Sequence, residues 1–475
     1  MNKYKKLASN TLIFAIGTFG SKILVILLSR LYAKHINAYD SGIKDNLETI
    51  ALFLQPIFTF ALQEYLIRFG LDRNYDKKKV FSTSACMTIA GMIALIIIVP
   101  GLRFIPILNF ISGYSLMLAI YVCTSSLRML CAQFVRSRDL VKLYAVDGII
   151  ATLTLLIFSF IFIAGMKMGV KGFLLSVILS DLLSVLFLYF SANLGIFFSV
   201  REFSVSLAGK MMKFALPLIP TIVMWTVTSM SDKLFLTNMR SSRVELGLSA
   251  TGIYGYANRI PNLVSMVSTI FFQAWNMSAI TENESADRGK FYQSVYSAYE
   301  AMLFIAAAGL IMICKPITNF LVPDDNFSEY GIVYIYTPIL IVAAIFMALN
   351  QFLGGIYSAT KHTQNSFWTS LTACAANLIL NWAMIPVIGI HGAAIATVMS
   401  YYLCFWARII DARYYIPFKF EASRSLINTG LVVAMSIIVI KAPPMWWLWN
   451  VLIFALVTVY NFKPMLATVK KVLKK

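Results

Sequence analysis

Residues 144–166 read YAVDGIIATLTLLIFSFIFIAGM, and residues 170–195 read VKGFLLSVILSDLLSVLFLYFSANLG. Each run is almost free of charge and long enough to cross a bilayer as a helix, which takes about 20 apolar residues. Runs of this kind follow one another along nearly the whole chain, about fourteen in all. They predict an all-α integral membrane protein with about fourteen transmembrane helices and no room for a soluble domain. The predicted spans cover residues 11–33, 46–68, 80–103, 112–134, 144–166, 170–195, 213–237, 253–280, 291–314, 332–357, 366–388, 392–414, 425–441 and 446–462.

The composition agrees with a chain whose solvent is lipid. Hydrophobic residues make up 59% of it and charged residues 13%, against about 45–50% and 25% in globular proteins. A net charge of +19 would suit a nucleic-acid-binding protein only if a basic soluble domain existed. When the N-terminus and every second loop are assigned to one side, most of the 40 basic residues fall on that side. The positive-inside rule makes this side cytoplasmic, so both termini are predicted inside, with Lys34 and Lys44 in the first outer loop.

No cofactor or metal is indicated. The six cysteines lie inside spans without a Cys-x-x-Cys pair, and the three histidines are scattered, so neither a disulfide framework nor a zinc site is predicted. Residues 17–22, GTFGSK, do not have the spacing of a phosphate-binding loop. The basic start before the first apolar run imitates a signal peptide, but no small-residue cleavage site ends the run, so we predict an uncleaved first span.

A repeat relates the two halves of the chain. Gly169-Val-Lys-Gly172 opens the sixth span, and Gly389-Ile-His-Gly392 opens the twelfth, 220 residues later. Upstream, Gln133-Phe134 recurs as Gln351-Phe352 at an offset of 218 residues. Because six spans separate the copies, both have the same orientation in the membrane, which is a parallel repeat. We therefore expect a six-helix lobe over residues 1–200, a second over 201–418, and two additional helices with a basic tail over 419–475.

Several spans carry charged or polar residues that lipid would not accept. The first has Lys22 in its middle, the seventh ends in Asp232 and Lys233, and the eighth carries Arg259. These residues either line an aqueous cavity or form ion pairs that only set helix packing. Asp147, near the end of the fifth span, is expected to reach water. Helical projections add the remaining candidates: Thr18, Ser29 and Arg30 beside Lys22, Asn258 and Asn262 beside Arg259, and Arg128, Asp181 and Glu300 in other spans.

The excess of cations over carboxylates within the spans predicts an anionic ligand. Guanidinium and ammonium groups attract a diphosphate more strongly at low dielectric than in water. A polar cavity with aromatic side chains also suits a sugar. The candidate substrate-binding cations are Lys22, Arg30, Arg128, Lys233 and Arg259, and the candidate polar lining is Thr18, Ser29, Asp232, Asn258 and Asn262.

Several segments resemble one family. Residues 212–220 (MKFALPLIP), Ser231-Asp232-Lys233, residues 252–260 (GIYGYANRI), residues 272–275 (FQAW) and residues 133–138 (QFVRSR) are similar to segments of the bacterial polysaccharide and O-antigen repeat-unit flippases (Wzx-type). These belong to the superfamily of multidrug, oligosaccharidyl-lipid and polysaccharide exporters. The resemblance covers essentially the whole chain, although each motif alone is loose.

The resemblance implies two six-helix bundles around a central cationic cavity. It also implies outward movement of undecaprenyl-diphosphate-linked oligosaccharide units across the bacterial plasma membrane by alternating access, without enzymatic activity. Lys22 and Arg259 are similar in position to cavity cations of such flippases. Implied partners are the lipid bilayer and, in the same pathway, a polysaccharide polymerase and chain-length proteins, with the flippase itself a monomer and no nucleic acid involved.

Two other functions stay open. A multidrug cation antiporter of the same superfamily would need acidic groups for the cation and its coupling ion, for which Asp181 and Glu300 are the candidates, but the cationic majority argues against it. A membrane polysaccharide polymerase or glycosyltransferase would need a large external loop or a carboxylate metal motif, and neither is evident in the sequence.

Overall fold

The computed structural model describes residues 24–473 except 73, 139, 217–218, 283–286, 323–329 and 361. The described residues form helices and connecting turns, with no strand among them. Nine of their helices are long and apolar enough to cross a membrane, and up to eleven if each of two bent helix pairs counts as one span. The predicted all-α membrane fold is thereby confirmed. Residues 1–23, with Thr18 and Lys22, lie outside the described part of the chain.

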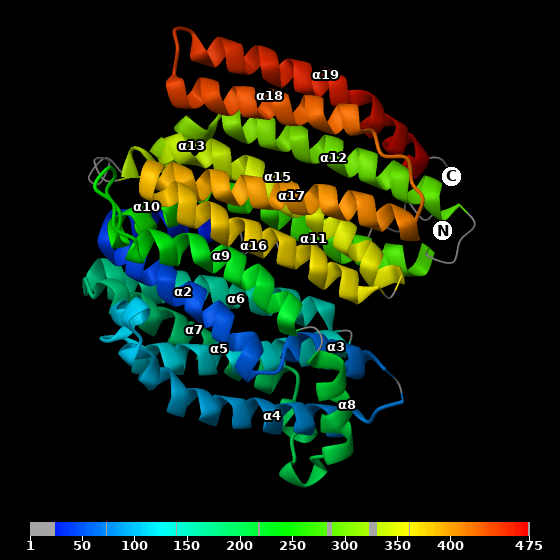
Figure 1. Ribbon diagram of the computed structural model, residues 1–475. Helices are drawn as coiled ribbons and strands as arrows, with labels where there is room; N and C mark the ends of the chain where they lie inside the picture. Colours follow the sequence, from blue (N-terminus) through cyan, green and yellow to red (C-terminus); the bar gives the residue numbers. More distant parts are fainter. Residues whose placement is uncertain are drawn as a thin grey trace. The chain divides into compact units, whose positions relative to one another are not determined.

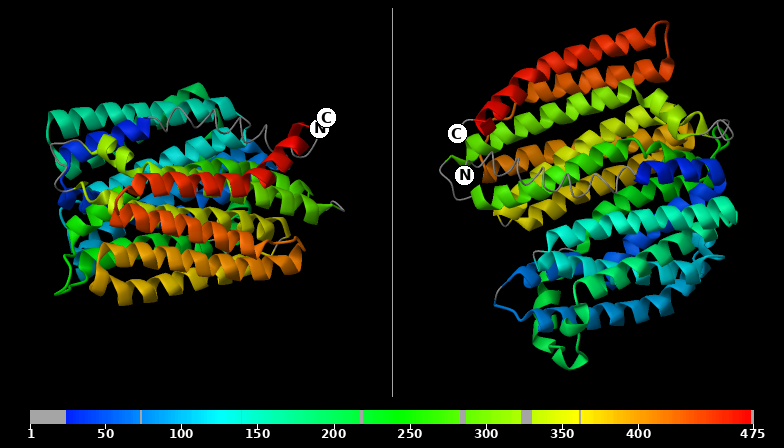
Figure 2. Two further views of the ribbon diagram at one scale, coloured as in Figure 1. Left: turned by 90° about the horizontal axis from the view of Figure 1, so that it is seen from above. Right: turned by 180° about the vertical axis from the view of Figure 1, so that it is seen from behind.

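The described chain divides into two compact units, with the division between Met230 and Ser231 inside one helix. The N-terminal unit (Figures 1 and 2) begins with a helix over 24–35. Its further helices are α2 (Ala38–Phe58), α3 (Leu62–Leu71), α4 (Lys77–Ile98), α5 (Ser115–Ser137), α6 (Val141–Ser159), α7 (Gly169–Ser191), α8 (Val205–Ala215) and the first half of α9 (Ile219–Asn238).

The C-terminal unit takes up the chain from Ser231. It contains the end of α9 and then α10 (Leu248–Ala257), α11 (Pro261–Glu282), α12 (Arg288–Met312), α13 (Cys314–Leu321), α15 (Val333–Thr360), α16 (Thr363–Ile388), α17 (Ile390–Tyr415), α18 (Ala422–Lys441) and α19 (Trp446–Leu473). Helices α18 and α19 form a hairpin that packs along α12, as Figure 1 shows. The expected lobe boundaries at 200 and 418 stay a prediction.

The second predicted span is broken. Helix α2 ends at Phe58 and α3 begins at Leu62, with an angle of 48° between them. Pro56 lies in the last turn of α2 and has no N–H to donate to the helix. Phe60 and Ala61 then take left-handed backbone angles, both with φ of 53°, which a continuous right-handed helix excludes. The chain therefore changes direction at this point.

Lys44 lies inside α2 and not in an outer loop. The helix begins early because Asn37 caps it, its side-chain oxygen accepting from the Asp40 N–H at 2.7 Å. The Lys44 ammonium is fully buried and donates to Asp45 at 2.7 Å and to Glu48 at 3.1 Å. The expectation of a loop lysine is wrong because carboxylates one and four residues later neutralise it within the helix.

The repeated glycines adopt the same backbone in both halves. Gly169 and Gly389 have positive φ angles of +53° and +57° at the start of α7 and α17, where glycine avoids the strain of a side chain. Three residues later, a Cβ on Gly172 would lie 3.0 Å from the Phe162 carbonyl oxygen. A Cβ on Gly392 would lie 2.6 Å from the Met384 carbonyl oxygen. Both glycines therefore let a helix pack closely on the one before it, α6 on α7 and α16 on α17.

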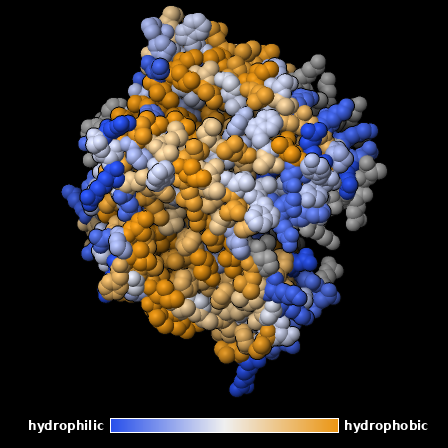
Figure 3. All heavy atoms as spheres, viewed as in Figure 1, coloured by the Kyte–Doolittle hydropathy of each residue, from blue (hydrophilic) through white to orange (hydrophobic). Residues whose placement is uncertain are grey.

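Apolar side chains cover much of the molecular surface. Ile97, Phe190 and Val459 are each more than 70% exposed. In Figure 3, hydrophobic residues spread over the middle lengths of the helices on the face shown, and hydrophilic residues gather near the helix ends. A water-soluble protein does not expose apolar area on this scale. The chain is a multi-pass membrane protein.

Gly392→Ala tests the close helix packing. We expect it to lower the stability of the purified protein by about 1–3 kcal/mol, because the Met384 carbonyl must move. Gly430→Ala is the matched control, since a Cβ there meets nothing within 4 Å. It should leave stability unchanged or slightly raised, by at most about 1 kcal/mol from helix propensity. Thermal unfolding in detergent measures both, and equal effects would contradict the packing argument.

Candidate functional site

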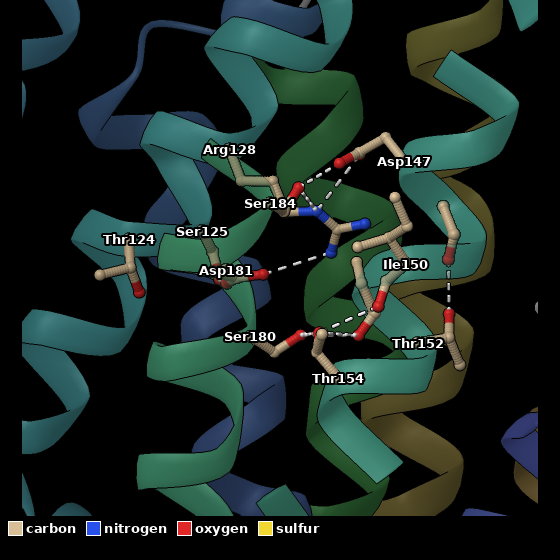
Figure 4. A network of polar contacts seen from close by, with 12 residues as sticks. Thr124, Ser125, Arg128, Asp147, Ile150, Thr152, Thr154, Ser180, Asp181 and Ser184 are labelled. Carbon is tan, nitrogen blue, oxygen red and sulfur yellow. Dashed lines mark hydrogen bonds and ion pairs between the residues drawn. The ribbon is translucent and has the colours of Figure 1, made fainter. Parts of the chain in front are cut away.

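A polar cluster lies among the apolar helices of the N-terminal unit. The Arg128 guanidinium of α5 lies 3.2 Å from the Asp181 carboxylate of α7 and 3.7 Å from the Asp147 carboxylate of α6. Its Nε also donates to the Ser184 hydroxyl at 3.1 Å. Ser184 in turn donates to Asp147, and Ser125 donates to Asp181. Figure 4 shows Arg128 between the two carboxylates.

Burial differs among the members of this cluster. The carboxylates of Asp147 and Asp181 are 2% and 5% exposed, whereas the Arg128 side chain is 32% exposed. The expectation that Asp147 reaches water is wrong, because Ser184 and Arg128 bind it inside the unit. Two buried carboxylates hold one guanidinium, so the cluster has a formal charge of −1. Arg128 and Asp181, predicted separately as a substrate cation and a coupling acid, are partners of each other.

A cavity of about 420 Å³ opens beside this cluster, within the usual range of small-molecule sites of about 300–1,000 Å³. Helices α2, α5, α6 and α7 line it, mostly toward the end where α5 ends and α6 begins. Gln133 lines the cavity, and its buried Oε1 has no hydrogen-bond partner among the described residues. The other polar and aromatic lining residues are Gln55, Tyr121, Ser125, Arg128, Tyr144, Asp147 and Asp181.

A second polar cluster belongs to the C-terminal unit and centres on Asp232 of α9. Its carboxylate accepts hydrogen bonds from Asn381 at 2.6 Å and from Asn377 at 3.1 Å, both on α16. Tyr254 of α10 and Thr397 of α17 donate to it at 2.6 Å each. The Asp232 side chain is buried, and among the described residues it forms no ion pair. Neutral donors alone therefore stabilise this carboxylate in an apolar unit, which is costly for a full charge.

The oxygen atoms around Asp232 are of the type that hard cations prefer. The Asn381 Oδ1 is buried and without a hydrogen-bond partner among the described residues. The nitrogen of the same Asn381 amide contacts Asp232, as do the Asn377 amide and the Thr397 hydroxyl. Within the described residues no three His, Cys, Asp or Glu side chains come together as a transition-metal site would require. The two amides and the hydroxyls of Tyr254 and Thr397 donate to Asp232, so a cation would bind here by replacing some of these hydrogen bonds.

Glu300 belongs to a third cluster, which binds the last two helices to α12. Its carboxylate lies 4.0 Å from the Arg424 guanidinium of α18. Arg424 also donates to the Ser297 carbonyl at 2.8 Å, and Asn461 of α19 exchanges hydrogen bonds with Asn428 of α18. All of these side chains except Ser297 are buried. Glu300, predicted for ion coupling, is thus placed where it stabilises the packing of α18 and α19.

The other predicted residues lie at helix ends and breaks. Asn258 and Arg259 occupy the break between α10 and α11, where Asn258 donates to the Tyr254 carbonyl at 2.9 Å. Arg259 is half-buried, and Asn262 is exposed on the first turn of α11. The structure therefore brings Asn258, Arg259 and Asn262 close together at one interruption of the eighth predicted span.

The described candidate residues of the first and seventh predicted spans lie within helices. In the helix over 24–35, Ser29 is buried and donates to the Val25 carbonyl at 2.9 Å, while Arg30 is exposed. Lys233, next to Asp232, is half-buried. Lys22 and Thr18, predicted as cavity residues of the first span, lie outside the described residues.

Sequence reasoning missed most partners of the two clusters. Asn377 and Asn381 are four residues apart on one face of an apolar span, a signal visible in the sequence. Gln133 was noted as part of the repeat but not as a site residue. Tyr254 and Thr397 have no comparable signal, since single hydroxyls are common in membrane helices.

Solved structures resemble the chain, although no family model and no curated protein matches it. A lipid II flippase, MurJ, in an inward closed conformation matches with a TM-score of 0.70 at 17% identity, over 97% of this chain and 100% of that one. An outward-facing multidrug resistance MATE family transporter of the MOP superfamily matches with a TM-score of 0.65 at 12% identity, over 88% and 96%. The chain shares the fold of these two solved structures.

A third similar solved structure contains a bound ion. The MATE transporter ClbM in complex with Rb⁺ matches with a TM-score of 0.58 at 14% identity, over 90% of this chain and 97% of that one. At these identities the likeness concerns the fold.

Arg128→Met tests the ion cluster. Removing the guanidinium leaves two buried carboxylates, so we expect a loss of up to about 3 kcal/mol, the low end for a buried pair because Arg128 is partly exposed. Adding Asp147→Asn and Asp181→Asn should restore most of the folded yield, because no unpaired charge then remains. Fluorescence-detected gel filtration of detergent extracts measures the yield. A triple variant as unstable as Arg128→Met would contradict charge balance as the cause.

Proposed function

We propose that the protein is a flippase that moves undecaprenyl-diphosphate-linked oligosaccharide units from the cytoplasmic to the outer leaflet of the bacterial plasma membrane, for polysaccharide biosynthesis. The observation that carries this proposal is the fold likeness to a lipid II flippase over 97% of the chain, against 88% for the MATE transporter. The net charge of +19 and the family-like segments support an anionic lipid-linked substrate.

In this proposal the cations contact the diphosphate and the sugar is carried with it. Lys22, Arg30, Lys233 and Arg259 attract the diphosphate, and Thr18, Ser29, Asn258 and Asn262 offer hydrogen bonds to it. Charge-assisted hydrogen bonds of this kind are stronger than neutral ones. The polyprenyl tail stays in lipid, because withdrawing it would expose apolar surface. Alternating access then releases the sugar on the outer side, with both termini cytoplasmic.

The alternative is a multidrug cation antiporter, as in the MATE structures. Such a protein needs acidic groups that are open to an organic cation. In the described residues Asp147, Asp181 and Glu300 are buried and lie against arginines, and Asp232 is enclosed by four neutral donors. This arrangement favours the flippase. A polymerase is not supported, because the similar solved structures are those of a flippase and of transporters.

Lys22→Ala and Arg259→Ala test the diphosphate contacts. Each variant loses a charge-assisted contact of about 1.5–3 kcal/mol, so export should fall roughly tenfold to a hundredfold. Lys22→Arg should keep part of the activity because the charge remains. The readout is accumulation of undecaprenyl-linked units on the cytoplasmic face of a deletion strain that expresses each variant at equal level.

Lys290→Ala is the matched control for these two alanine variants, because the Lys290 side chain is 86% exposed. It should export normally. Normal export by both Lys22→Ala and Arg259→Ala would eliminate the role proposed for these cations. Efflux of organic cations without export of lipid-linked sugar would establish the antiporter instead.

The Asp232 cluster supports a monovalent cation as the coupling ion. The carboxylate lacks an ion pair among the described residues, and Asn381 presents a buried oxygen without a partner. Bound Na⁺ would neutralise Asp232 in exchange for some of the hydrogen bonds that the carboxylate now accepts. The ion would be cargo that drives transport and not a resident cofactor. Exchange of this ion between the two sides would supply the energy for a cycle of alternating access.

Asp232→Asn tests the cation. A ligand that binds only the folded protein stabilises it by mass action, so Na⁺ should raise the unfolding temperature of the wild type more than choline does. Asp232→Asn should lose this difference. Asp287→Asn is the control, since the Asp287 side chain is 71% exposed. An equal Na⁺ effect in Asp232→Asn, or no effect in the wild type, would contradict the site.

A further inference from the structure

We propose that the cavity of the N-terminal unit is a binding site for the uncharged sugar portion of the substrate. The hydroxyl-rich ring would lie against Gln133, Gln55 and Arg128. This inference rests on the proposed flippase function and assigns the sugar and the diphosphate to different residues. It also changes the role predicted for Arg128, from a diphosphate cation to a donor for sugar hydroxyl groups.

The charges around the cavity do not suit a diphosphate. Asp147 and Asp181 already neutralise Arg128, and the cluster as a whole is negative. A diphosphate would therefore contact a guanidinium whose positive charge is already outweighed by two carboxylates, so the net electrostatic attraction is lost. A small organic cation is not favoured either, because both carboxylates already bind Arg128 and accept hydrogen bonds from Ser125 and Ser184, which the cation would have to replace. The cavity lining is polar and carries a formal charge of −1, with each of its charged groups already bound to another group of the cluster.

Both hydrogen-bond donors and hydrogen-bond acceptors line this cavity. The buried Oε1 of Gln133 accepts from no described group, and such an acceptor costs about 1–3 kcal/mol unless a donor arrives. Arg128 uses Nε and one Nη for its contacts with Ser184 and the two carboxylates, so its second Nη is left to donate. Gln55 adds an amide. A sugar hydroxyl both donates and accepts, which matches this mixture.

Two aromatic side chains complete the lining. Tyr121 of α5 and Tyr144 of α6 both border the cavity. Tyrosine rings can pack against the C–H side of a pyranose and their hydroxyl groups can hydrogen-bond to it. An apolar drug would leave the Gln133 and Arg128 groups unsatisfied, which disfavours it.

The repeat provides an internal comparison. Gln351 is the counterpart of Gln133, 218 residues later in the C-terminal unit. There the Oε1 accepts a hydrogen bond from Ser268 at 3.1 Å. The same residue type is thus satisfied within the protein in one unit and left with a free acceptor at a cavity in the other. Gln133 therefore has an acceptor that a ligand in the cavity could use, whereas the Gln351 acceptor is already used.

The experiment uses the full-length protein purified in detergent. Saturation-transfer NMR measures binding of a panel of neutral mono- and disaccharides, among them N-acetylglucosamine, galactose and rhamnose, with inorganic diphosphate and tetraphenylphosphonium as charged probes. Gln133→Leu and Gln55→Leu should each weaken saccharide binding roughly threefold to tenfold through the loss of a hydrogen bond. Diphosphate binding should not change, and Gln351→Leu, the matched control, should leave saccharide binding at the wild-type level.

The outcomes separate this site from the proposed function. If the wild type exports lipid-linked sugar and Gln133→Leu neither reduces that export nor weakens saccharide binding, the sugar site is wrong and the flippase function stands. Binding of no saccharide, or Gln133-dependent binding of tetraphenylphosphonium instead, also overturns the sugar site. If the wild type exports no lipid-linked sugar, the proposed function itself fails. Unfolding temperatures of all variants verify that each is folded.

Discussion

Placing charge in a medium without water is the constraint on which the polar architecture of this protein depends. An isolated ion inside the helices is unfavourable by several kcal/mol or more, so each buried charge requires a partner or a set of donors. Lys44 has two carboxylates, Arg128 has two, and Arg424 has Glu300. Asp232 is the exception among these, because only neutral groups bind it. The exception makes Asp232 the most informative charge in the C-terminal unit.

The two halves share a scaffold and differ in the chemistry built on it. The glycine turns at Gly169 and Gly389 have nearly equal φ angles, so the hairpins are built alike. At the repeat offsets, Arg128 and Asp181 correspond to Phe346 and Tyr401. The ion pair of the N-terminal unit is therefore replaced by aromatic residues in the C-terminal unit, where Asp232 provides the buried charge. The two halves thus have alike glycine turns and different buried polar groups.

The sequence was sufficient for the helical membrane fold, because apolar length and glycine spacing are local properties. It also identified Arg128, Asp181, Asp232 and Glu300 as charges that need an explanation. It did not identify their partners. Arg128, Asp147 and Asp181 lie on three separate helices, and they come together only because of the way these helices are oriented when they pack. The burial of Lys44 escaped prediction for a related reason. The hydropathy pattern predicted that the second span starts at residue 46, whereas α2 starts at Ala38 and contains both Lys44 and its carboxylate partners.

Helix α9 connects the two proposals. The division between the units falls between Met230 and Ser231, and Asp232 follows directly on the same helix. Ser231 and Asp232 are held by Asn377 and Asn381 of α16, while Ile219 and Ile222, earlier on α9, pack against the core of the N-terminal unit. A cation bound at Asp232 would compete with the amides and hydroxyls that now bind this carboxylate. Its arrival would alter how the end of α9 is held in the C-terminal unit while the beginning stays packed in the unit with the sugar cavity. The two proposals together therefore make α9 the helix through which ion binding would act on substrate movement.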